Sequence, residues 1–98
     1  MKDIRYVVFH SPGPNWLPGR SMFEQPGLDL HVAHYRALFE QGRLMAGGPH
    51  LDERGGGMMV PEAGLGEDEI TAFAQADPAV QSGLLTVQVR PWLLGMKR

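Results

Sequence analysis

The order in which two kinds of hydrophobic periodicity follow one another constrains the fold of this 98-residue chain more than any other feature. Apolar residues alternate in four stretches, as in strands, and recur every three to four residues in two others, as in helices. The strand-like stretches are residues 4–10, 43–48, 58–61 and 84–92, and the helix-like stretches are residues 28–41 and 67–77. The predicted order is therefore strand, helix, strand, strand, helix, strand.

This order predicts a single α+β domain over residues 1–98, of the ferredoxin-like βαββαβ type, with an antiparallel sheet that carries both helices on one face. The first strand is apolar on both faces, because Tyr6 and Val8 alternate with Val7 and Phe9, and we therefore place it centrally. No helix remains to cover the other face of the sheet. We expect a homodimer that buries this face.

A proline-rich segment, residues 11–27, separates the first strand from the first helix. It contains four prolines and no periodicity, and a structureless connection of this length is unusual inside a compact domain. It also carries apolar side chains that a free tether would expose to water, namely Trp16, Leu17, Met22 and Phe23. We predict that residues 11–27 form an ordered arm or lid, packed on the domain or on a second subunit.

Composition excludes several classes of partner and site. Nine Lys and Arg against eleven Asp and Glu give a net charge of −2, which argues against a nucleic-acid-binding protein. The apolar run that follows Met1–Asp3 is too short for a signal-peptide core or a membrane span. The chain has no cysteine, so disulfides and thiolate metal sites are excluded. We expect a cytoplasmic protein without nucleic-acid or membrane partners.

The predicted topology brings polar residues to one end of the molecule. The end of the first strand, the start of the first helix, the tip of the hairpin between strands two and three, and the end of the second helix all lie there. This end collects all four histidines and one aspartate: His10, His31, His34, His50 and Asp77. A histidine beside a carboxylate is the minimal set of groups for proton transfer, so the convergence predicts a functional site.

Asp77 is the most informative of these residues. It continues the apolar stripe of the second helix, and its charge near a helix C-terminus opposes the helix dipole. Local rules are most often broken at functional sites. A structural role is the alternative, because Asp77 followed by Pro78 can cap a new helical turn, and one carboxylate could serve both roles. His31 lies on the apolar face of the first helix and His34 at its flank; we predict that His34 pairs with Asp77.

Further residues at the same end are predicted to contact a small-molecule ligand. They are His10, His31, Tyr35, Pro49, His50 and Arg54. His10 and His50 would lie at the rim, and the inward-facing Tyr35 would have its hydroxyl hydrogen-bonded. An arginine on a flexible segment, Arg20 or Arg54, could bind a substrate carboxylate.

Two other interpretations of the same end remain open. His31 and His34 could bind a metal ion with Asp77 as a third ligand, or the domain could handle haem. No cysteine or second histidine pair supports such a site, so we expect neither a metal nor a cofactor. Alternatively, the domain binds a small molecule or a protein without catalysis, and the histidine–aspartate pair only fixes the helices.

Several short motifs occur together in a fixed order after residue 28. They are His34–Tyr35–Arg36–Ala37–Leu38, Gly42–Arg43–Leu44, Gly48–Pro49, Ala76–Asp77–Pro78, Gly83 and Arg90–Pro91–Trp92. In these motifs the chain resembles the YCII-related (YciI-like) family, which is placed with the dimeric ferredoxin-like α+β barrels. The resemblance implies a dimer of the α/β-barrel type and a His/Asp-centred site at His34 and Asp77. Ala79 departs from the family, which usually has an aromatic residue after Asp–Pro, and this should enlarge that wall of the site.

The function that these observations favour is proton transfer by a small cofactor-free enzyme. The resemblance implies a lyase or isomerase, because relatives act as dehydrochlorinases of chlorinated hydroxyquinols and the wider superfamily includes muconolactone isomerases. His34 would move a proton on a small cyclic or phenolic acid, and Asp77 would orient the imidazole. The alternative is a non-catalytic small-molecule-binding or interaction domain.

Overall fold

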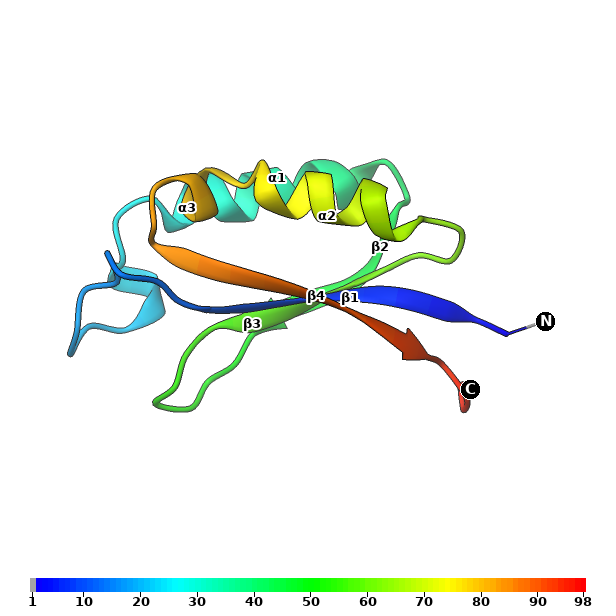
Figure 1. Cartoon of the computed structure of the whole chain (residues 1–98). Coiled ribbons are helices and arrows are strands. Elements are labelled where there is room, and N and C mark those ends of the chain that lie inside the picture. The colour runs from blue at the N-terminus through cyan, green and yellow to red at the C-terminus, as the bar shows by residue number, and fades with distance from the viewer. Residues whose placement is uncertain (1) are drawn as a thin grey trace.

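The computed structural model describes residues 2–98 as a four-stranded antiparallel sheet with helices on one of its faces (Figure 1). The strands are β1 (Ile4–Pro12), β2 (Leu44–Pro49), β3 (Gly57–Pro61) and β4 (Leu85–Leu93). The helices are α1 (Leu28–Glu40), α2 (Glu67–Gln75) and α3 (Pro78–Gln81), and a short 3-10 helix, η1 (Met22–Glu24), precedes α1. The strand order β2-β3-β1-β4 confirms the predicted ferredoxin-like α+β fold.

Two element boundaries differ from the prediction for identifiable reasons. β1 extends to Pro12 because it pairs with β4 as far as Leu85, so long-range pairing sets its end. The second predicted helix, residues 67–77, ends earlier, since α2 stops at Gln75, and a separate short helix, α3, begins at Pro78. Proline lacks a backbone N–H and has a helical φ, so it starts a helix more readily than it continues one.

The hydrophobic core lies between the sheet and the helices. Its first cluster joins β1 to α2 through the buried side chains of Val8, Ile70 and Ala74. A second cluster, Tyr35, Leu38 and Leu44, joins α1 to β2. Tyr6 and Val8 therefore face the helices, and β1 is the central strand that its apolar character predicts.

The opposite face of the sheet carries no helix among residues 2–98 (Figure 1). Val7 on this face is 1% exposed, whereas Trp92, which pairs with Arg5, is 42% exposed. Arg5 is itself buried: it donates a hydrogen bond to the carbonyl oxygen of Pro61 at 3.0 Å and pairs with Asp3 at 3.0 Å. The homodimer that would bury this face stays a prediction.

The first half of the proline-rich segment packs on its own chain. The amide of Gly13 donates to the carbonyl oxygen of Leu84 at 2.8 Å, and Asn15 Nδ2 donates to that of Ser82 at 2.7 Å. A Cβ atom at Gly13 would lie 2.3 Å from the carbonyl oxygen of Gly83, so only glycine permits this approach. Residues 13–15 are thus ordered against the loop that precedes β4, while a lid function for the whole arm stays a prediction.

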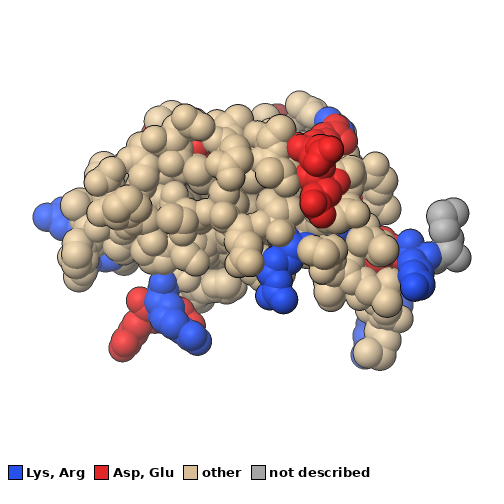
Figure 2. Space-filling view, in the orientation of Figure 1, with Lys and Arg blue, Asp and Glu red and all other residues tan. Residues whose placement is uncertain are grey.

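Charged side chains are sparse on the face of the molecule that Figure 2 shows. Acidic side chains gather at the start of α2, where Glu67, Asp68 and Glu69 form its first turn. Their charge complements the helix dipole. No helix within residues 2–98 combines the length and apolar character that crossing a membrane requires.

Candidate functional site

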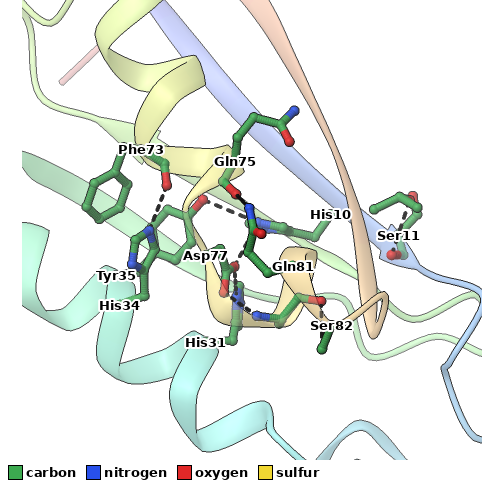
Figure 3. Close-up of polar contacts among 12 residues, drawn as sticks. His10, Ser11, His31, His34, Tyr35, Phe73, Gln75, Asp77, Gln81 and Ser82 are labelled. Carbon is green, nitrogen blue, oxygen red and sulfur yellow. Dashed lines mark hydrogen bonds and ion pairs between the residues drawn. The ribbon is translucent and has the colours of Figure 1, made fainter.

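A buried hydrogen bond joins the first turn of α1 to the start of α3 (Figure 3). His31 Nδ1 lies 2.6 Å from Asp77 Oδ2, and both side chains are buried. The other carboxylate oxygen, Asp77 Oδ1, accepts the backbone N–H of Ala79 at 2.9 Å. Asp77 therefore caps α3 with one oxygen and holds an imidazole with the other, so both roles considered for this carboxylate are present together.

The antiparallel arrangement of α1 and α2 determines which histidine meets Asp77. The two helices lie side by side and run in opposite directions (Figure 1). Three residues along α1, from His31 to His34, cover about 4.5 Å, and four residues back from Asp77 to Phe73 cover about 6 Å. His31 is accordingly level with Asp77, and His34 is level with Phe73.

His34 does not supply the imidazole that binds Asp77, so the predicted His34–Asp77 pairing is wrong. Its Nε2 lies 2.7 Å from the carbonyl oxygen of Phe73. Its ring also stacks on the Phe73 ring, with centroids 3.9 Å apart and an angle of 20° between the planes. His34 thus ties α1 to α2, one turn away from the carboxylate.

His10 from β1 extends the buried polar cluster. Its Nε2 lies 3.3 Å from the Tyr35 hydroxyl and 3.8 Å from Asp77 Oδ2. Its ring meets the His31 ring edge to face, with centroids 4.7 Å apart. The buried Nδ1 atom of His10 has no hydrogen-bond partner within residues 2–98. Buried N–H groups without a partner are rarer than acceptors without one, so we assign the His10 proton to Nε2.

Burial and hydrogen bonding together set the charges of this cluster. Burial, reinforced by the neighbouring His31, lowers the pKa of His10 to about 4, so His10 is neutral at neutral pH. Burial and the charge of Asp77 raise the pKa of the Tyr35 phenol, which stays protonated. Burial alone would raise the pKa of Asp77, but hydrogen bonds from His31 and the Ala79 amide outweigh it and lower that pKa. Asp77 is therefore an ionised, buried carboxylate.

The charge of Asp77 fixes the tautomer of His31. An ionised carboxylate only accepts hydrogen bonds, so His31 carries a proton on Nδ1 and donates it to Asp77 Oδ2. In the neutral form of this ring the lone pair is on Nε2, and residues 2–98 offer this atom no hydrogen-bond partner. Because His31 lines a pocket, that lone pair is placed to accept a proton from a ligand.

The pocket has a volume of about 530 Å³, within the range of small-molecule sites. Its lining comes from all four strands, from α1 and from the segment before α1. Most of the lining side chains are apolar, including Trp16, Met22 and Phe23 from that segment. The polar side chains that line it are His10, His31, Tyr35 and Arg36. The pocket is therefore an apolar hollow with a small polar group of residues on one side.

Glycine residues in β2 and β3 line this hollow and permit close packing between the two strands. Gly47 pairs with Met59, which packs against the core beneath the helices. A Cβ atom at Gly47 would lie 2.2 Å from Met59 Sδ, and one at Gly57 would lie 2.5 Å from the carbonyl oxygen of Gly48. Glycine at these two positions therefore allows Met59 and the β2 backbone to come this close.

The structure places the predicted ligand-contacting residues in two groups. The residues that line the pocket are His10, His31, Tyr35 and Pro49. His50 and Arg54 lie on the exposed loop between β2 and β3 and do not line it, which corrects their predicted place. The Arg54 side chain is 93% exposed and lies 3.9 Å from Asp52. Arg36 also lines the pocket, and it was not predicted from the sequence. Its spacing of four residues from Val32, another lining residue on α1, puts both on one helical face.

Metal binding at this cluster can be tested against its geometry. Ligand atoms of His10, His31 and Asp77 all lie within 4.8 Å of one another; His34 is outside this set. Two ligands of one ion that each lie about 2.1 Å from it are separated by roughly 3 Å or more. His31 and Asp77 are 2.6 Å apart, so an ion would have to replace their shared proton and separate them. The geometry fits proton sharing better than metal binding.

Comparison with known protein families matches residues 4–93 to the YCII-related domain. None of the curated proteins compared with this chain matches it closely enough to count as a relative. The family match spans nearly the whole chain and includes every strand and helix described above. This chain therefore belongs to the YCII-related family.

Proposed function

We propose that this protein is a small enzyme that moves a proton on a ligand bound in the pocket, with His31 as the base and Asp77 as the positioning residue. One observation carries the proposal: the 2.6 Å hydrogen bond from His31 Nδ1 to the buried Asp77 carboxylate. This bond keeps a proton on Nδ1 and leaves Nε2 for the ligand. A histidine oriented in this way by a carboxylate is a general base.

The proposed reaction begins when His31 Nε2 accepts a proton from a C–H or O–H group of the ligand. Asp77 stabilises the imidazolium that forms, because its charge is buried 2.6 Å from the other ring nitrogen. If His31 returns the proton to a different atom, the reaction is an isomerisation. If the electron pair of a broken C–H bond expels a leaving group from the adjacent carbon, the reaction is an elimination.

Tyr35 offers the ligand a hydrogen-bond donor. Its pKa is raised, so the phenol keeps its proton, and with the His10 proton on Nε2 the Tyr35 oxygen acts as an acceptor toward that ring. The hydroxyl hydrogen is then available to a ligand oxygen on which negative charge develops. Membership of the YCII-related family assigns no reaction to this pocket, so the assignment is argued from the contacts of these residues.

The test is proton exchange with solvent, which can be measured on candidate ligands whatever product the reaction forms. A panel of small cyclic and phenolic acids is incubated with the protein in D2O, and deuterium incorporation is followed by NMR. We expect incorporation into at least one member of the panel, with His31→Gln lowering its rate at least about 100-fold, in the range of general-base contributions. Asp77→Asn should also lower the rate strongly, because an amide would favour the other His31 tautomer.

His34→Gln is the matched control, since His34 lies on the same helix but binds the Phe73 carbonyl oxygen. It should retain exchange within about threefold of the unmodified protein. Exchange that is equally fast in His31→Gln and in the unmodified protein would exclude His31 as the base. Loss of exchange in His34→Gln but not in His31→Gln would assign the base to His34 and refute the proposal.

A further inference from the structure

We infer that the pocket takes an amphipathic acid whose apolar body lies toward His31 and whose anionic group is bound by Arg36. This inference rests on the proposed function, because it names the class of ligand for the same pocket. It assigns the anion contact to an arginine on α1, rather than to Arg20 or Arg54 on the loops.

Among residues 2–98, Arg36 is the one lysine, arginine, aspartate or glutamate that lines the pocket. Arg5, Arg43 and Arg54 each lie beside a carboxylate, whereas Arg36 has no ion-pair partner among the described residues. A guanidinium in this state can bind a carboxylate with two parallel hydrogen bonds. The pocket therefore combines one available positive charge with an otherwise apolar lining.

The apolar part of the ligand is indicated by aromatic side chains around the pocket. Phe23 from η1 is 75% exposed and Phe39 from α1 is 56% exposed, and both line the pocket with Trp16. Exposed aromatic side chains that border a hollow mark a site where an apolar group binds. These rings come from three separate segments of the chain, so an apolar group in the pocket would meet aromatic side chains on more than one side.

The position of Arg36 along α1 determines how the ligand is oriented. Arg36 lies five residues after His31, an axial rise of about 7.5 Å, and it is exposed whereas His31 is buried. The anionic group would therefore stay near solvent, where it keeps part of its hydration. The apolar body would extend inward to His31, so the reacting atom is not part of the anionic group.

The experiment compares two probes of the same shape, 2-naphthoate and the uncharged 2-naphthamide, by NMR titration of the whole protein at low salt. We expect 2-naphthoate to bind about tenfold more tightly than 2-naphthamide, as for a hydrogen-bonded charge pair at a partly exposed site. Arg36→Gln should remove this difference while leaving 2-naphthamide binding unchanged, and Arg36→Lys should restore part of it. Added salt should weaken 2-naphthoate binding only.

Arg54→Gln is the matched control and should leave the affinity for both probes unchanged, since Arg54 does not line the pocket. Equal affinities for the two probes, no binding of either probe, or a preference for the acid that survives Arg36→Gln would each overturn the inference. His31→Gln separates this inference from the proposed function: it should abolish exchange but retain the Arg36-dependent preference. A preference for the acid without any proton exchange would leave this ligand class standing and refute the enzyme assignment.

Discussion

The two oxygens of Asp77 allow its capping role to be separated from its contact with His31 by two substitutions. Asp77→Ala removes the acceptor for the His31 N–H and the cap for the Ala79 amide. Asp77→Asn keeps an oxygen for the Ala79 amide and presents an NH2 group to His31. His31 can then stay hydrogen-bonded only if its proton moves to Nε2.

The expected magnitudes follow from these contacts. A hydrogen bond to a buried charged group contributes about 1.5–3 kcal/mol, and a helix cap about 1 kcal/mol. Asp77→Ala should therefore lower the free energy of unfolding by about 3 kcal/mol. Asp77→Asn replaces a charged hydrogen bond with a neutral one and should cost about 1 kcal/mol. The lowered pKa of Asp77 supports a loss in both, because it shows that the folded protein favours the ionised carboxylate despite its burial.

Urea denaturation followed by tryptophan fluorescence at pH 7 measures the loss in the free energy of unfolding for each substitution. The 15N chemical shifts of the His31 ring report its tautomer. We expect Nδ1–H in the unmodified protein and Nε2–H in Asp77→Asn. Equal destabilisation by the two substitutions would refute the division of roles between the two oxygens. An unchanged His31 tautomer in Asp77→Asn would refute the argument that this carboxylate orients the base.

Two further predictions concern acid stability and assembly. The pKa of His10 is about 4 in the folded protein against 6.5 as its ordinary value, so the unfolded chain binds the proton more readily between these values. The contribution of neutral His10 to the free energy of unfolding should be complete above pH 6.5 and decrease by ~3 kcal/mol as the pH falls from 6.5 to 4. In His10→Gln, the stability measured by thermal unfolding should no longer show this dependence on pH. The pKa of Asp77 is lowered from its ordinary value of 3.8, so protonation of Asp77 reduces stability only at still lower pH. Light scattering should detect a dimer that Trp92→Glu dissociates, because Trp92 is exposed on the sheet face without helices; a monomeric unmodified protein would contradict this.

The fold could be predicted because its periodicities are local properties of the chain. Alternation in β1 and the three-to-four-residue spacing in α1 each arise from one element, and few topologies accommodate their order. The ends of elements are less predictable, since they depend on partners distant in sequence. β1 continues to Pro12 because Leu85 is available to pair with it, and no feature of residues 11–12 alone indicates this.

The choice between His31 and His34 depends on how α1 and α2 are aligned along their axes. That alignment is set by side-chain packing, including the stacking of His34 on Phe73, and periodicity does not specify it. One signal in the sequence nevertheless favours His31. It lies on the apolar face of α1 with Tyr35, and a histidine buried there needs a polar partner, which Asp77 on the apolar stripe of the second helix could provide.

The wall of the pocket connects Ala79 with the proline-rich segment, residues 11–27. The small residue at Ala79, after Asp77–Pro78, predicts an enlarged site. Ala79 is instead buried in a cluster with Leu84 and Leu85, and Trp16 from the proline-rich segment packs against this cluster and lines the pocket. An aromatic ring thus reaches this region from residues 11–27 rather than from position 79. A larger residue at 79 would overpack the buried cluster against which Trp16 lies, so the small residue and the proline-rich segment are two parts of one arrangement.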